Sequence, residues 1–325
     1  MKFRKLFLTL SILIIVVFPG NVFSAARDYP NRQIEIVVPM APGGTTDVCV
    51  RILSEELSKN LGVPVIVSNK PGGSGAAAAE YVAKAKPDGY TLLSPTNTVF
   101  VTLPLTVPSV SYKWSDFVPI IRVANIPLII FTKAESPFNS MADIAAYARK
   151  NPGKLNCGLV GAGSTTHFDF ELWRGKENVD IGFIPYQGGG PLLTAQLGGH
   201  VDFGVINLPP IYGLVKSGKI KLIAATGKLK EFPQVPTFAE IGFPECNIGV
   251  WVALVAPGKT PKEIAAVLAK ASLKALQNQA VIDKMEKLSY TVDVMDAKTF
   301  ATAMNNEIKL LGPIKEKVLK SIEGK

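Results

Sequence analysis

The feature that most constrains this chain is the stretch from Ile34 to Leu57. A β-branched apolar run meets a loop of Pro, Gly and Thr, and the loop leads directly into a helical pattern with one apolar face. Thr45 or Thr46 can cap that helix, and Asp47 lies in its first turn, where the helix dipole favours an acid. The loop would present free N–H groups that suit an anion. An ordinary capped turn between strand and helix would have the same pattern, so this loop alone does not decide between the two.

The same order of strand, polar loop and helix recurs along the chain. Strands are predicted at 63–67 and 91–93, with a helix through residues 76–85 between them. A second series follows, in which apolar runs again lead into Gly-, Ser- or Pro-rich loops. Such alternation predicts parallel sheets with right-handed crossovers. The expected strands of this second series are 155–160, 181–184, 201–206 and 221–226.

Two long apolar runs do not fit a single compact unit. Residues 117–132 are interrupted by Pro127, and residues 248–257 form a second such run, so we expect one to cross between two domains and the other to return. Helices are predicted at 261–276, near 281–288 and at 297–322. The resulting prediction is two doubly wound α/β domains. The first is discontinuous (27–124 and 247–325) and the second, 125–246, is inserted into it.

Composition narrows the class of protein. Of the 325 residues, 47% are hydrophobic, and the formal net charge is +9. The sequence has no run of basic residues of the kind that binds nucleic acid. Residues 1–26 have a basic start, a short apolar run and small residues before Arg27, which is typical of a cleaved secretory signal. We therefore expect an exported, periplasmic protein. Its three cysteines are widely spaced, without CxxC, and buried free thiols are expected.

Five polar loops share one design, and all follow predicted strands. In an open parallel sheet such loops lie along one edge, where ligands bind. They contain no Arg or Lys, so backbone N–H groups and hydroxyls would have to hold an anionic ligand. A molecule with an anionic group at each end would suit helix N-termini from two facing domains. The loops are 39–47, 94–98, 161–167, 186–191 and 207–210.

The spacing of the relevant residues does not support a nucleotide site, a catalytic triad or a metal site. Residues 73–78 match GxGxxA, but close helix packing also explains small residues there. Gly258-Lys259-Thr260 resembles the end of a P-loop, yet Pro261 follows at once and a helix start is the better interpretation. Ser164, His167 and Asp169 crowd onto one helix start, unlike a catalytic triad assembled from separate elements. No cluster has metal-ligand spacing, and neither a metal nor a cofactor is expected.

Several of these segments, in this order, resemble the solute-binding proteins of tripartite tricarboxylate transporters, also called the Bug family. The resemblance covers nearly the whole chain from Tyr29, and its most distinctive motifs are VPMAPGGTTDVCVR, NKPGGSGAAAAEYVA, GAGSTTH, PYQGGGP and VDFGVINLPP. It implies a type II periplasmic binding fold, in which two α/β domains close over a small carboxylate in the cleft between them. It also implies a monomer that binds no nucleic acid and delivers its ligand to membrane subunits without chemistry.

The resemblance implies that two loops reach the ligand, the first strand-to-helix loop and the Ser/Thr loop of the second domain. One departure is Ile206, where many members have Asp, and an apolar wall there favours a dicarboxylate with an apolar middle over an amino acid. A protein that signals to a membrane sensor and an exported hydrolase are the alternatives. Taken together, the predicted ligand-binding residues are Pro42, Gly43, Gly44, Thr45, Thr46, Asp47, Thr96, Asn97, Ser164, Thr165, Thr166, His167, Tyr186, Gly188, Gly189 and Asn207.

Overall fold

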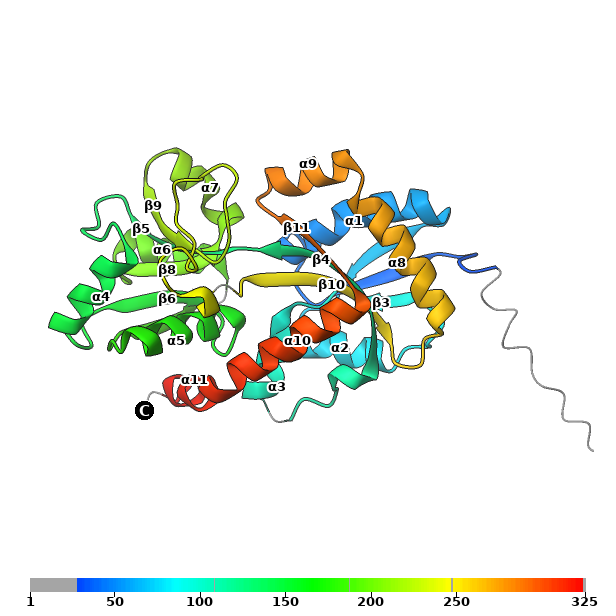
Figure 1. Ribbon diagram of the computed structural model, residues 1–325, viewed down its shortest axis with the longest axis horizontal. Helices are drawn as coiled ribbons and strands as arrows, with labels where there is room; N and C mark the ends of the chain where they lie inside the picture. Colours follow the sequence, from blue (N-terminus) through cyan, green and yellow to red (C-terminus); the bar gives the residue numbers. More distant parts are fainter. Residues whose placement is uncertain (1–27, 108, 187, 247, 324–325) are drawn as a thin grey trace, which may run out of the picture.

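The computed structural model describes residues 28–107, 109–186, 188–246 and 248–323. The predicted signal segment, 1–26, lies outside these residues. Two sheets lie side by side along the long axis of the molecule, and helices cover each of them (Figure 1). We call the first sheet with its helices lobe 1 and the second sheet with its helices lobe 2. Both are mixed sheets, so the expectation of parallel sheets was wrong in this respect, while the predicted fold class of two α/β units is confirmed.

The first sheet has six strands in the order β11-β4-β10-β3-β1-β2. β1 pairs in parallel with β2 and β3, whereas β10 is antiparallel to both β3 and β4 because it returns from the other lobe. β11 was not predicted, since its alternation of apolar and acidic residues is short. The bounds are β1 Ile34–Val38, β2 Val65–Asn69, β3 Thr91–Leu93, β4 Phe117–Ile126, β10 Val250–Pro257 and β11 Thr291–Asp296.

The second sheet has five strands in the order β7-β6-β8-β5-β9. β6 pairs in parallel with β7 and β8, and β5 is antiparallel to β8 and β9. In each sheet, a strand that connects to the other lobe is antiparallel to its neighbours: β10 in the first sheet and β5 in the second. The bounds are β5 Leu128–Lys133, β6 Asn156–Val160, β7 Gly182–Tyr186, β8 Phe203–Asn207 and β9 Ile220–Ala225.

The crossing determines how the two sheets face each other. β4 ends at Ile126 and β5 begins at Leu128, so only Pro127 separates a strand of one sheet from a strand of the other. β1 and β3 run in the same direction as β4, toward the crossing, and β6 and β8 also run toward it because they oppose β5. The carboxyl edges of both sheets therefore face one another across the crossing strands.

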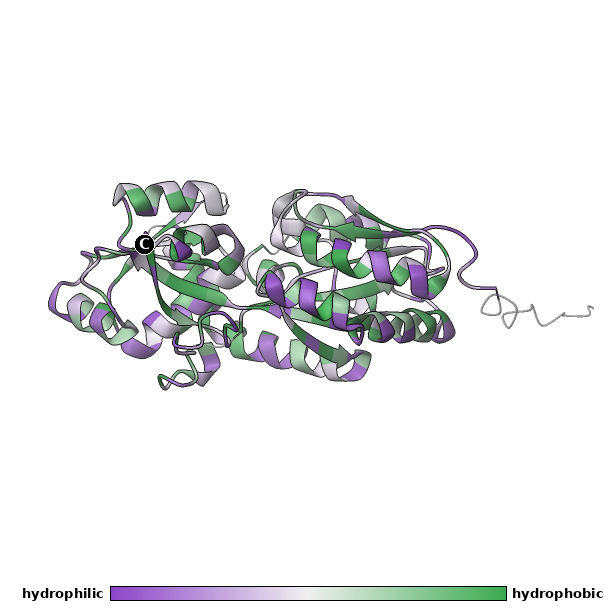
Figure 2. Ribbon diagram, turned by 90° about the horizontal axis from the view of Figure 1, so that it is seen from above, coloured by the Kyte–Doolittle hydropathy of each residue, from purple (hydrophilic) through white to green (hydrophobic). Residues whose placement is uncertain are grey.

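Helices follow most strands and bury apolar faces against the sheets, and many of the sheet strands are hydrophobic along much of their length (Figure 2). Gly44, rather than Thr45 or Thr46, is the N-cap of α1, and no side chain caps it. No described helix is long and apolar enough to cross a membrane. The bounds are α1 Thr45–Leu61, α2 Ala76–Ala83, α3 Leu103–Thr106, α4 Met141–Lys150, α5 Thr165–Glu177, α6 Gly189–Gly198, α7 Leu208–Lys216, α8 Lys262–Leu276, α9 Gln279–Lys287, α10 Ala297–Leu311 and α11 Lys315–Ile322.

The C-terminal helices form a further link between the lobes. α10 packs on β4, and its Phe300 contacts Trp251 of the neighbouring strand β10 edge to face, with ring centroids 5.0 Å apart. The chain then continues under the junction, and α11 packs against both α3 of lobe 1 and α5 of lobe 2 (Figure 1). The lobes are thus joined by two crossings of strands and by the last helix.

Candidate functional site

The predicted site loops lie at the two facing sheet edges, and two of them touch. The hydroxyls of Thr98, after β3, and Thr165, at the start of α5, lie 3.2 Å apart. A Cβ on Gly163 would lie 3.1 Å from the hydroxyl oxygen of Thr106, so the loop before α5 packs directly on lobe 1. Hydroxyls from the two lobes therefore meet where the topology brings the carboxyl edges together.

The loop before α1 is held from inside lobe 1. The buried carboxylate of Asp47 accepts hydrogen bonds from Gly43 N (2.9 Å), Asn69 Nδ2 (2.8 Å) and Arg51 Nε (2.9 Å). Burial by itself raises the pKa of Asp47, but the hydrogen bonds outweigh it and keep the pKa below its ordinary value. Asp47 therefore supports the loop, whereas Pro42 and Gly43 are exposed at its tip.

The helix that follows this loop begins with two threonines. Thr46 is buried, and Thr45 is half-buried with its carbonyl accepting a 2.8 Å hydrogen bond from the Tyr290 hydroxyl. Tyr290 precedes β11, so a segment far away in the sequence fixes the start of α1. Nothing in the sequence pattern indicated this contact.

The loop after β3 is buried and carries two unpartnered hydroxyls. Asn97 Nδ2 donates to the carbonyl of Gly249 (2.8 Å) and to Glu307 Oε1 (2.9 Å), which ties the loop to β10 and α10. Ser94 and Thr96 are buried, and among the described residues neither hydroxyl has a hydrogen-bond partner. Because buried hydroxyls are normally paired, this loop has spare hydrogen-bonding capacity next to the junction.

The loop before α5 is the most strongly constrained of the five. Gly161 and Gly163 have φ of +78° and +69°, which favours glycine. The hydroxyl of Ser164, the N-cap, donates to Val160 O (2.8 Å) and accepts from the backbone N–H of His167. The ring of His167 is fully buried, and its Nδ1 accepts from Gly163 N at 3.1 Å. The triad considered from the sequence is not assembled, because Ser164 and His167 do not share a side-chain hydrogen bond in the described structure.

Thr165 and Thr166, which follow the cap, are both buried. Thr165 faces Thr98 of lobe 1, while the hydroxyl of Thr166 makes no hydrogen bond with any described residue. Thr166 is therefore the residue of this loop whose hydroxyl is available for a ligand.

Two more predicted loops lie at the same edge of the second sheet. The backbone N–H of Gly161 donates to Tyr186 O (3.1 Å), which joins the loops after β6 and β7. A Cβ on Gly189 would lie 2.7 Å from Ile206 Cδ1, so a side chain at this position would have to displace the end of Ile206. Gly188, with φ of +115°, is the N-cap of α6.

Asn207 is the last residue of β8 and the N-cap of α7, so residues 208–210 form the first turn of a helix and not the predicted loop. Its Nδ2 donates to the carbonyl of Pro127 at 3.2 Å. Asn207 therefore connects the end of β8 to the residue at which the chain crosses between the lobes.

A pair of acids at the junction was missed by sequence analysis. Asp169 of α5 and Glu307 of α10 come from opposite lobes, and Asp169 is buried while Glu307 is half-buried. Burial first, and then the nearby Glu307, raise the pKa of Asp169 well above its usual range, against a lowering contribution from the backbone N–H of Gly249. Burial likewise raises the pKa of Glu307, although Trp251 and Asn97 donate to its carboxylate.

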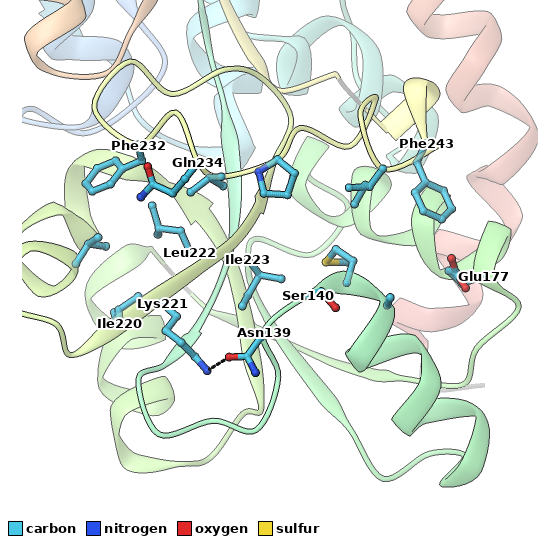
Figure 3. Close-up of a pocket in the computed structure, with 16 residues that line it drawn as sticks. Asn139, Ser140, Glu177, Ile220, Lys221, Leu222, Ile223, Phe232, Gln234 and Phe243 are labelled. Carbon is cyan, nitrogen blue, oxygen red and sulfur yellow. Dashed lines mark hydrogen bonds between the residues drawn. The ribbon is translucent and has the colours of Figure 1, made fainter.

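A cavity of about 650 Å³ lies elsewhere, on lobe 2, between β9, the start of α4 and the segment 232–243 (Figure 3). Ile223, Phe232 and Phe243 form part of its apolar wall, and Lys221 bonds Asn139 at its rim (Figure 3). None of the predicted ligand-binding residues lines it. The candidate site is therefore identified by where the strand ends meet, not by cavity size.

The three cysteines are free and buried, as predicted.

Comparison with known proteins agrees with this geometry. Residues 49–319 match the family model described as the tripartite tricarboxylate transporter family receptor, TctC. The chain is 35% identical to Protein BugT of Bordetella pertussis over 263 residues, covering 80% of this chain and 81% of that protein.

Among solved structures, an R. palustris protein with adipate superimposes with a TM-score of 0.78 at 32% identity, covering 90% of this chain and 98% of the other. MatC from Rhodopseudomonas palustris with bound malate gives 0.76 at 28% identity, covering 88% and 100%.

The two facing α/β lobes, joined by crossing strands, define the class of periplasmic solute-binding proteins. Within that class the chain belongs to the TctC receptor family, the Bug proteins. Its relatives and its fold are those of binding proteins rather than enzymes.

Proposed function

We propose that this protein is an exported receptor that captures a small carboxylate between its two lobes and presents it to the membrane subunits of a tripartite tricarboxylate-type transporter. The observation that carries the proposal is the meeting of the two carboxyl edges, with hydroxyls of Thr98 and Thr165 in contact across the junction. The buried, unpartnered hydroxyls of Ser94 and Thr96 lie on the same loop as Thr98. The basic, apolar segment 1–26 supports export.

The chemistry of these loops supports an anion held by uncharged donors. The loops 39–47, 94–98, 161–167 and 207–210 contain no Arg or Lys, so helix N-termini and hydroxyls would neutralise the acid. A hydrogen bond to a charged group contributes roughly 1.5–3 kcal/mol, and micromolar affinity needs about 8 kcal/mol. Three or four such bonds per carboxylate suffice, even after the ordering costs of binding.

Within the acids, we propose a dicarboxylate with an apolar middle. Ile206 is 5% exposed and packs against Gly189, which makes this part of the wall apolar. An amino acid would need a partner for its ammonium group, and Ile206 offers none. The adipate and malate bound by two structural relatives are both dicarboxylates, which supports the same class.

We also propose that the two lobes are the domains 27–124 with 247–325, and 125–246, and that they close over the ligand. A ligand shifts a conformational equilibrium only by its differential affinity for the two states. An acid that touches the loops of both lobes only when they are close together satisfies this condition.

A thermal-shift screen tests the ligand class. Dicarboxylates of four to eight carbons, citrate and aromatic acids are compared with amino acids, and native mass spectrometry looks for a small acid that co-purifies. At a hundredfold excess over its Kd a ligand stabilises the protein by about 2.7 kcal/mol. Stabilisation by an acid is expected, and stabilisation by amino acids alone would reject the proposal.

A pair of isosteric variants tests the site. Thr166→Val removes a hydroxyl at the start of α5 without changing the shape of the side chain, and we expect a weaker affinity for the acid found in the screen. Thr302→Val is the control, because its hydroxyl bonds Lys298 O within α10. Equal affinities for the wild type and Thr166→Val would remove this residue from the site.

A further inference from the structure

The last helix of the chain reaches the candidate ligand loop through one histidine. The Oγ of Ser321, on α11, lies 3.0 Å from Nε2 of His167, and the other ring nitrogen, Nδ1, accepts from the backbone N–H of Gly163 at 3.1 Å. The imidazole is fully buried and packs against the ring of Phe183, with centroids 4.1 Å apart. One ring therefore joins the C-terminal helix to the turn before α5.

The partners fix the proton positions on this ring. Nδ1 accepts a hydrogen bond, so in neutral imidazole the proton must be on Nε2. The hydroxyl of Ser321 donates to Val318 O at 2.7 Å, which leaves its oxygen to accept from Nε2–H. The result is a chain of hydrogen bonds from Gly163 to His167, Ser321 and Val318, in which every donor has an acceptor.

A competing acceptor makes Ser321 necessary. Oε1 of Glu171 lies 3.6 Å from Nε2, beyond hydrogen-bond distance, and has no hydrogen-bond partner in the described structure. The other oxygen of Glu171 is held by Arg174 at 2.9 Å. Without the Ser321 oxygen, the Nε2–H would turn toward Glu171, and Nδ1 would move away from Gly163.

We propose that Ser321 is a positioning residue that acts through His167 to fix the turn 161–164, and with it the first N–H groups of α5. The inference rests on the proposed function only in assigning that turn to ligand binding. It makes the C-terminal helix, which is distant in sequence, part of the binding apparatus. Two variants test this role. Ser321→Thr keeps the hydroxyl, whereas Ser321→Val has the same shape as the threonine variant but lacks the hydroxyl.

The first measurement needs no ligand. The chain has two histidines, so the imidazole ¹⁵N signals of His167 are assigned with a His200→Gln variant. The wild type and Ser321→Thr are expected to show the Nε2–H tautomer and slow exchange of the Gly163 amide. Ser321→Val and Ser321→Ala are expected to show at least about tenfold faster exchange, because a factor of ten corresponds to about 1.4 kcal/mol. Equal exchange in all four proteins overturns the proposal.

The second measurement uses adipate as the probe. Loss of one neutral hydrogen bond predicts an affinity about 3- to 10-fold weaker in Ser321→Val, restored in Ser321→Thr. Ser217→Ala is the control, since that hydroxyl also donates to the carbonyl three residues back, at the end of α7. If the wild type binds no tested acid, the proposed ligand class fails, while the tautomer and exchange data still decide the role of Ser321.

Discussion

The turns before α1 and α5 have similar sequences but are held in different ways. Both follow a parallel strand, contain two glycines and open into a helix that begins with two threonines. The turn before α1 is fixed within lobe 1 by Asp47, which bonds Gly43, Asn69 and Arg51. The turn before α5 is fixed across the junction, by Thr98 and by the C-terminal helix. A shared sequence pattern thus predicts where a turn lies, but not what supports it.

The acids that follow these turns make the contrast sharper. Asp47 and Asp169 are both buried, in the first two turns of their helices. The hydrogen bonds to Asp47 lower its pKa, whereas burial, with Glu307 nearby, raises that of Asp169. Replacing the two carboxyl groups should therefore change stability in opposite directions at neutral pH.

The largest effect is expected from Asp47→Ala. It removes three hydrogen bonds to a charged group, each worth roughly 1.5–3 kcal/mol, so a loss of about 3 kcal/mol or more is expected. Because the pKa of Asp47 is lowered on folding, its contribution is present above the unfolded-state pKa and is lost as pH falls through the folded one. Urea unfolding of both proteins at pH 7 and in acid measures this.

The control for Asp47→Ala is Asp143→Ala. Asp143 occupies the same place in α4 and accepts from Asn139 N at 2.8 Å, but that bond is exposed. A smaller loss is expected from the control. If the two variants lose equal stability, the burial of Asp47 is irrelevant and the contrast between the two turns fails.

The next effect is smaller and has the opposite sign. Asp169→Asn is expected to raise stability at pH 7 by on the order of 1 kcal/mol, since neither carboxylate oxygen has a hydrogen-bond partner in the described structure. The unfolded chain releases this proton near pH 3.8, but the native protein retains it to higher pH. Wild-type stability should therefore fall as pH rises above 4, until the folded pKa is passed.

Melting temperatures between pH 4 and 8 measure how steeply stability falls with rising pH in the wild type and in Asp169→Asn. Asp296→Asn is the control, since Asn and Asp cap helices equally well and Asp296 accepts from Thr299 N as the N-cap of α10. An unchanged slope in Asp169→Asn would show that Asp169 does not carry the effect.

The sequence predicted most of the strands and polar loops, but not β11, because these features follow from local patterns. The apolar runs on either side of Pro127 and the return run at 248–257 became β4, β5 and β10. The contacts that support the site join distant segments, such as Tyr290 with Thr45 and Asn97 with Glu307. Such pairs leave no periodic signal, so the sequence could propose polar residues for the site but could not separate those that support a loop from those left free.

The smallest expected effect concerns the contact between the lobes. A double-mutant cycle of Thr98→Val and Thr165→Val isolates the energy of the 3.2 Å contact between the hydroxyls. A coupling energy of about 0.5–1.5 kcal/mol is expected, as for a single neutral hydrogen bond. Unfolding free energies of the four proteins give the value, and a coupling energy of zero would mean that the loop after β3 and the start of α5 lie close without stabilising one another.

The interrupted path of the chain also sets an order of events during synthesis. The second sheet is built from one continuous stretch, residues 128–225, and can pair as soon as that stretch is available. The first sheet cannot, because β10 fills the place between β3 and β4 and comes more than a hundred residues after them. Until it arrives, both neighbours have unpaired edges that can join to other chains. A molecule in which only the second sheet has formed therefore has half of its architecture complete and the other half open to aggregation.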